Sequence, residues 1–167
     1  MAPRSSVAHH PHRGATPVAS AQMNNVGVKM ATPTINDMMV AYAEDAVDFA
    51  RSKFGITLDY TSGSVERVEF MAEQLVQARP KGLIGKLLRK APSEQEIQTV
   101  CKMLGGYVGE VYRRAKGGEW AVDQAHQALG VNQGETWIFP PAKVHKRLTN
   151  GAEDNLWSYF NLLLAER

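Results

Sequence analysis

Cysteine and long hydrophobic runs are scarce in this sequence, and each scarcity excludes a class of protein. The 167 residues include one cysteine, Cys101, which excludes an internal disulfide framework and a multi-cysteine zinc site. No apolar run reaches the roughly 18 residues that a membrane-spanning helix needs. With 44% hydrophobic and 22% charged residues, the chain has the composition of one globular domain. Its cysteine usage favours a reducing, cytoplasmic setting.

Acidic residues are absent from the first 36 positions, whose Arg4, Arg13 and Lys29 give a charge of +3. Because the whole chain carries +2, the remainder is close to neutral at −1. A nucleic acid would require a broad basic face, so the near-neutral remainder argues against one as the main ligand.

The segment 1–32 is rich in Ala, Ser, Pro, His, Gly and Asn and has no repeating apolar pattern. It could bury too little surface to offset the entropy lost when a backbone is ordered. We therefore predict a disordered leader at 1–32 and a single domain at 33–167. Met23 and Met30 leave a later start open, and Pro17 interrupts the apolar stretch that a secretory signal would need.

Apolar residues recur at three- and four-residue steps in several segments, which predicts amphipathic helices. Thr34 with Asp37, and Ser93 with Glu96, have the spacing of capping boxes, while Gly55 is suited to end the first helix. The predicted helices cover 35–54, 64–79, 93–116, a short stretch around 144–148, and a last stretch around 156–163.

Between Glu119 and Phe139 the period changes from that of a helix to alternation. Trp120 alternates with Val122, Trp137 alternates with Phe139, and 132–134 offers a turn, so a small antiparallel sheet is expected. We predict an α+β fold in which helices at both ends of the domain pack on this sheet.

Gly105, Gly106 and Gly109 lie inside the third predicted helix, where each should cost about 1 kcal/mol relative to alanine. Close packing against the first helix or the sheet is the favoured compensation. The alternative is a groove that admits a ligand or a partner chain.

Three residues are candidates for acid–base chemistry: Glu110 as an acid, Asp123 as an orienting group and His126 as a base. The competing interpretation of Glu110 is an exposed ion pair with Arg113 and Arg114, which lie three and four residues further along. No nucleophile or oxyanion-hole motif accompanies them, and Cys101 falls on an apolar stripe, which predicts a buried thiol.

Histidines do not form a pattern that predicts a metal site. His9, His10 and His12 lie in the leader, whereas His126 and His145 stand apart without paired ligands at helical spacing. No glycine-rich phosphate loop is present, so we predict neither a metal nor a cofactor.

The most basic stretch, 79–90, holds five basic residues and no acid. It predicts a short amphipathic helix, for which a connector with leucines on the core and charges in water is the favoured interpretation. The functional alternative is an acidic partner bound through Lys81, Lys86, Arg89 and Lys90. A second basic group, Lys143, His145, Lys146 and Arg147, is interpreted as the solvated face of its helix.

Several short motifs resemble a group of small bacterial domains of unknown function. They run from 106–114 through Gly117-Gly118-Glu119-Trp120 to Ile138-Phe139-Pro140, and then continue through Val144, Lys146-Arg147-Leu148 and Asn150-Gly151. The resemblance covers about Leu58 to the C-terminus and carries no catalytic residue with it. Some proteins of similar size and layout neutralise bacterial toxins as immunity partners. The resemblance therefore implies toxin neutralisation as one expected function of this chain.

The preferred functional hypothesis is a bacterial protein-binding module without a catalytic site. The alternatives are a toxin-neutralising immunity protein, a hydrolase that uses Glu110, Asp123 and His126, and a binder of nucleic acid or another polyanion.

Overall fold

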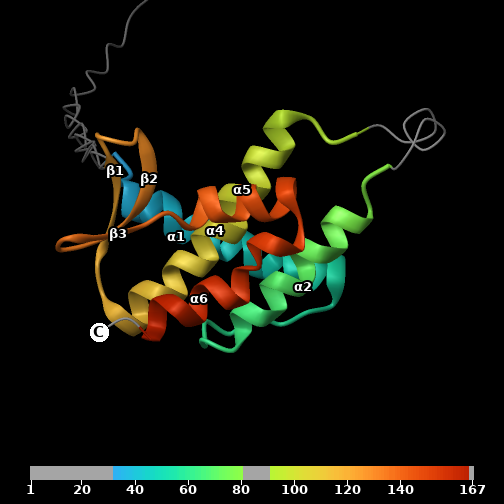
Figure 1. Cartoon of the computed structure of the whole chain (residues 1–167), viewed down its shortest axis with the longest axis horizontal. Coiled ribbons are helices and arrows are strands. Elements are labelled where there is room, and N and C mark those ends of the chain that lie inside the picture. Colours follow the sequence, from blue (N-terminus) through green and yellow to red (C-terminus); the bar gives the residue numbers. More distant parts are fainter. Residues whose placement is uncertain (1–31, 81–90, 166–167) are drawn as a thin grey trace, which may run out of the picture. The chain divides into compact units, whose positions relative to one another are not determined.

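The computed structural model describes residues 32–80 and 91–165, and within them it confirms the predicted α+β fold (Figure 1). The helices are α1 (Ile35–Phe49), α2 (Ser64–Gln77), α4 (Glu94–Lys116), α5 (Pro140–Asn150) and α6 (Leu156–Ala165). A π-helical turn, η1 (Ala50–Phe54), continues α1, and a 3-10 turn, η2 (Ala152–Asp154), precedes α6. The predicted leader, apart from Thr32, and residues 81–90 of the basic stretch lie outside the described residues.

Both predicted capping boxes are present. The Thr34 side chain accepts a hydrogen bond from the Asp37 amide at 3.1 Å, and Ser93 accepts one from the Glu96 amide at 3.2 Å. The carboxylates of Asp37 and Glu96 accept the reciprocal bonds from the cap amides. Gly55 ends the first helical run in the left-handed region, with φ at 66°. These local signals therefore fix where α1 and α4 begin and where the first run stops.

The sheet has the antiparallel order β1 (Glu119–Asp123), β2 (Ala128–Gln133) and β3 (Thr136–Ile138). Val131 of β2 pairs with Trp120 on one side and with Ile138 on the other. The expected turn at 132–134 is placed two residues too early, because Asn132 and Gln133 continue β2 as far as a turn at Gly134. Buried and exposed residues do not alternate cleanly along the middle strand, in part because Gly130 has no side chain. A Cβ added to Gly130 would lie 2.4 Å from the Ile138 carbonyl oxygen, so the close approach of β3 requires a glycine here.

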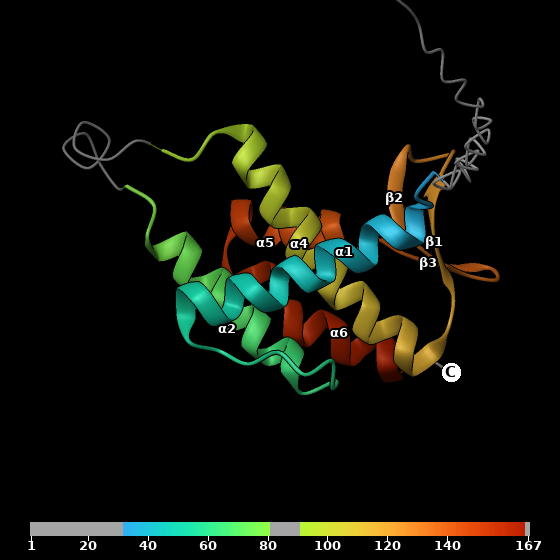
Figure 2. The same ribbon diagram turned by 180° about the vertical axis from the view of Figure 1, so that it is seen from behind.

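The helix α4 is the central element of the core and packs against α1, α2, α5 and α6. In Figure 2, which views the molecule from behind, α1 crosses in front of α4. Most of the fully buried side chains at these contacts are apolar: Met39, Ala43 and Ala46 of α1, Val65, Val68 and Met71 of α2, and Leu104, Val108 and Val111 of α4. Ser64, Tyr107 and Arg147 are also fully buried and carry polar groups.

The three glycines of α4 each face a different neighbour, which confirms the close-packing interpretation. A Cβ on Gly105 would lie 2.5 Å from Pro141 Cα of α5, and one on Gly106 would lie 3.1 Å from the Met39 carbonyl oxygen of α1. A Cβ on Gly109 would lie 2.2 Å from the Trp120 ring of β1. The first helix and the sheet were expected here, whereas the contact with α5 was not.

The interpretation of Lys143, His145, Lys146 and Arg147 as the solvated face of their helix is wrong for Arg147. The side chain is 1% exposed, because it lies on the inward side of α5 with Val144 and Leu148. Its Nε donates to Glu69 at 2.8 Å, its Nη2 donates to Glu73, and the other oxygen of Glu69 accepts from the Leu156 amide at 2.7 Å. One buried cation thus connects α2, α5 and the start of α6.

Replacing Gly105 with alanine is expected to destabilise the protein by about 2 kcal/mol, because overpacking a core typically costs about 1–3 kcal/mol. The matched control is Gly63→Ala, since a Cβ there meets nothing within 4 Å and the backbone is already right-handed. The control should leave stability unchanged or slightly raised. Urea unfolding followed by circular dichroism measures both, and equal loss in the two variants would contradict the close approach of α4 and α5.

Arg147→Met should cost about 3–5 kcal/mol, since it leaves two carboxylates without their buried cation. Arg67→Met provides the comparison, because Arg67 pairs with Asp59 at 3.4 Å while both side chains are about half exposed, at 47% and 43%. A surface pair of this kind contributes at most about 1 kcal/mol. Thermal unfolding of the two variants tests the difference, and a similar loss in both would show that the Arg147 cluster is not a stabilising connection.

Candidate functional site

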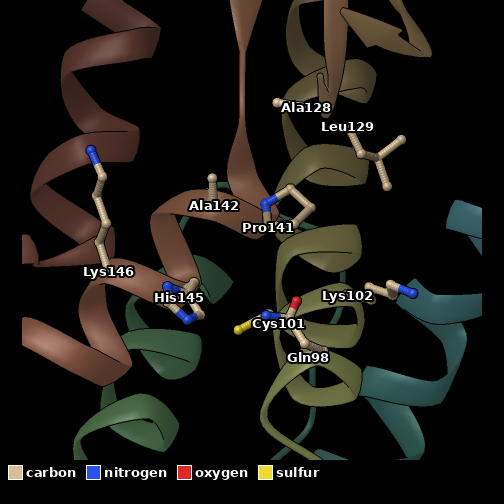
Figure 3. Close-up of a pocket in the computed structure, with 9 residues that line it drawn as sticks. All are labelled: Gln98, Cys101, Lys102, Ala128, Leu129, Pro141, Ala142, His145 and Lys146. Carbon is tan, nitrogen blue, oxygen red and sulfur yellow. The ribbon is translucent and has the colours of Figure 1, made fainter. Parts of the chain in front are cut away.

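Two adjoining hollows flank α5. The first, of about 380 Å³, lies where α4, β2 and α5 meet, and the second, of about 390 Å³, lies where β3, α5 and α6 meet. Ala128, Ala142 and Lys146 line both. We call the two hollows together the α5 groove. Its other lining residues are Gln98, Cys101, Lys102, Leu129, Pro141 and His145 in the first hollow (Figure 3), and His126, Trp137, Ile138, Phe139, Lys143, Tyr159 and Leu163 in the second.

The start of α5 explains how the groove is formed. Phe139 leaves β3 and is followed at once by Pro140 at the first helical position, where a missing amide donor costs nothing. The helical period then buries Val144 and Leu148 and leaves Ala142 and Lys146 exposed. Ala142 is small, so it opens space on this side of the helix.

Aromatic rings form one wall of the second hollow. Trp137 and Phe139, two residues apart on the same side of the chain, are nearly parallel, with ring centroids 6.0 Å apart and an interplanar angle of 7°. The His126 ring meets Phe139 edge to face at 5.9 Å. Aromatic pairs prefer such offset and edge-to-face arrangements. The wall therefore has a fixed geometry before any ligand arrives.

The cations of the groove differ in how far they are neutralised. Lys143 donates to Asp154 at 2.7 Å and lies over the Tyr159 ring at 5.4 Å. The hydrogen bond from Lys143 lowers the pKa of Asp154, so this carboxylate stays charged to lower pH than a free aspartate. Lys146 is exposed. Its charge contributes to the lowered pKa of Asp154, but that carboxylate is hydrogen-bonded to Lys143 instead. Positive charge is thus available at the position that both hollows share.

The structure brings together only two of the three acid–base candidates. His126 Nδ1 is hydrogen-bonded to Asp123 at an exposed turn, and this bond is the main cause of the lowered pKa of Asp123. Glu110 is 5% exposed and accepts hydrogen bonds from the Trp120 indole at 2.8 Å and from Arg113 at 2.7 Å. The expected ion pair between Glu110 and Arg113 is thus present, but it is not exposed, because the Glu110 carboxylate is buried and also holds the Trp120 ring.

Arg114, the other arginine of that expectation, instead stacks on the Tyr60 ring, with its guanidinium carbon 3.6 Å from the ring centroid. Tyr60 has a positive φ of 59°, which is unusual for a residue other than glycine. Its amide donates to the Tyr107 hydroxyl at 2.7 Å, and that hydroxyl lies 2.6 Å from Ser64 Oγ. These contacts hold the loop before α2 in place.

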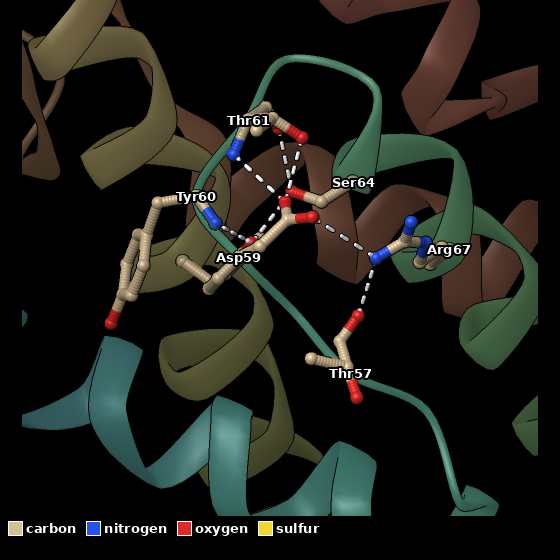
Figure 4. Close-up of polar contacts among 7 residues, drawn as sticks. Thr57, Asp59, Tyr60, Thr61, Ser64 and Arg67 are labelled. Carbon is tan, nitrogen blue, oxygen red and sulfur yellow. Dashed lines mark hydrogen bonds and ion pairs between the residues drawn. The ribbon is translucent and has the colours of Figure 1, made fainter.

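Around the same loop, Asp59 accepts two hydrogen bonds from Thr61, and Arg67 donates to the Thr57 carbonyl at 2.6 Å (Figure 4). The bonds from Thr61 lower the pKa of Asp59. Ser64 is fully buried and its hydroxyl donates to the Thr61 carbonyl. The polar groups of this loop are therefore engaged in its own conformation.

Cys101 is 2% exposed, which confirms the predicted buried thiol, and burial raises its pKa to about 11. It points from α4 toward the same hollow as His145 of α5 (Figure 3). This proximity could not be predicted from the sequence, because the two residues belong to separate helices. A raised thiol pKa is the opposite of what a nucleophilic cysteine requires.

The predicted partner-binding residues Lys81, Lys86, Arg89 and Lys90 lie outside the described residues, as do His9, His10 and His12. Within 32–80 and 91–165, no three His, Cys, Asp or Glu side chains form a group that could hold a metal ion. No helix in this described part of the chain combines the length and the apolar character needed to cross a bilayer.

Comparison with protein-family models, curated proteins and solved structures gives no significant match. The resemblance to small bacterial domains of unknown function therefore stays a prediction.

Cys101 should react slowly with iodoacetamide in the folded protein. A pKa of about 11, against an ordinary value of about 8.5, leaves at least about 100-fold less thiolate near pH 7.5. The native rate should accordingly be at least about 100-fold below that of the same chain in urea, as measured by mass spectrometry at timed intervals. Comparable native and unfolded rates would mean that the thiol is accessible and activated.

Proposed function

We propose that this chain is a bacterial binding module without catalytic activity of its own, and that it binds an acidic segment of another protein in the α5 groove. The observation that carries the proposal is the placement of Lys146. It lines both hollows, it is exposed, and apolar and aromatic side chains surround it.

The balance of charge supports a short acidic segment as the ligand. Asp154 pairs with Lys143 and Asp123 pairs with His126. The positive charge that remains is carried mainly by Lys102 and Lys146, with His145 between them in the first hollow. Binding to a phosphate backbone draws on many basic contacts, so this small excess suits one or two carboxylates better.

The apolar lining supports a protein as the partner. Protein interfaces combine an apolar centre with charged groups near the rim, and most of their affinity comes from a few side chains that enter pockets. Here Leu129, Pro141 and Ile138 contribute apolar surface, and the lysines lie beside it. Toxin neutralisation, which the resemblance implies, would be one form of such binding.

The proposal predicts that a fluorescein-labelled decapeptide rich in Asp and Glu binds the full chain, as measured by fluorescence anisotropy. Lys146→Glu should weaken binding about tenfold, because like charges across an interface repel and tenfold corresponds to about 1.4 kcal/mol. Lys53→Glu is the matched control, since this exposed lysine of η1 lines neither hollow. It should bind as the wild type does.

Absence of binding by acidic peptides, or an equal loss in Lys53→Glu, would contradict the proposal. A single-stranded oligonucleotide that binds more tightly than the peptides, with an affinity that falls steeply as salt is added, would favour the polyanion alternative instead.

A further inference from the structure

We infer that the second hollow of the α5 groove is an anchor pocket for an aromatic side chain of the bound acidic segment. This inference rests on the proposed function and specifies its ligand: a carboxylate at Lys146, followed closely by a ring that enters the space between β3, α5 and α6. Lys146 would bind the carboxylate, and the aromatic residues of the second hollow would contact the ring.

The walls of this hollow have the chemistry of a ring-binding pocket. Trp137 and Phe139 provide a parallel pair of rings, His126 presents its ring near Phe139, and Tyr159 and Leu163 come from α6. A volume of about 390 Å³ lies within the range of about 300–1,000 Å³ usual for small-molecule pockets. An aromatic side chain would gain ring contacts here that a leucine side chain cannot make.

A hydrogen bond and an ion pair position the walls before binding. Asp123 accepts a hydrogen bond from His126, whose ring meets Phe139, and Asp154 fixes Lys143, whose ammonium lies over the Tyr159 ring. A pocket whose side chains are already ordered loses less entropy when a ligand enters. Aspartates whose pKa values are lowered keep these contacts across the neutral range.

The charge at the mouth of the hollow decides what kind of ring enters. Lys146 lines it, whereas the charge of Lys143 is balanced by Asp154, so the remaining positive charge would repel a cationic ring or an alkylammonium group. An aromatic residue next to aspartate or glutamate is favoured, because its neighbour reaches Lys146 while the ring occupies the hollow.

The experiment compares acidic decapeptides that differ at one position, occupied by Phe, Trp, Leu or Ala, in anisotropy titrations of the full chain. The Phe and Trp peptides should bind at least about fivefold more tightly than the Leu and Ala peptides. In Trp137→Leu, the Phe peptide should bind no better than the Ala peptide binds the wild type.

Ala142→Leu is a second variant, and it leaves all the aromatic side chains that line the hollow in place. Ala142 is exposed on α5 and lines the hollow, so a larger side chain there should block the ring without disturbing the core. Ala41→Leu is the matched control, because Ala41 is exposed on α1 and belongs to neither hollow. Circular dichroism verifies that each variant is folded.

The outcomes separate the two proposals. Equal binding of the Phe, Leu and Ala peptides would overturn the anchor pocket and leave the acidic ligand in place, whereas failure of all four to bind would overturn both. An unchanged preference for Phe in folded Ala142→Leu would also overturn the anchor pocket.

Discussion

The close approach that three glycines allow on one helix is the constraint on which the arrangement of this domain depends. At Gly105 and Gly109, α4 approaches α5 and the Trp120 ring to distances that a Cβ would not permit, and at Gly106 it approaches α1 so closely that a Cβ would be crowded. Each glycine weakens the helix on its own, so the tertiary contacts must compensate. Glu110 reinforces one of them, because its buried carboxylate holds the Trp120 indole against Gly109.

The candidate groove is a consequence of this packing. Because Gly105 lets Pro141 approach α4, the first turn of α5 is fixed directly after β3. The Arg147 cluster fixes the far end of the same helix through the carboxylates of α2. With both ends held inward, the opposite side of α5 presents Ala142 and Lys146 between two hollows. The position of this surface therefore depends on the contacts that anchor α5 on its buried side.

Local signals in the sequence were sufficient for most of the helices. Capping boxes at Thr34 and Ser93 and the stop at Gly55 depend on residues within one turn of each other, so they could be identified without tertiary information. The burial of Cys101 followed from its place on an apolar stripe. The middle strand β2 was not recognised, because Gly130 interrupts its pattern and its pairing partners lie on other strands.

The candidate site could not be identified in the same way. His126, Trp137, Lys146 and Tyr159 line one hollow although they come from a turn, a strand and two helices. Arg147 looked like one more cation beside Lys146, yet α2 supplies two carboxylates that allow it to be buried.

The sequence by itself determined the fold class, the starts of α1 and α4, the stop at Gly55 and the apolar faces, since these depend on neighbours within a few residues. Only the tertiary structure decided which charges are paired and which rings meet, because those contacts join residues that are distant along the chain.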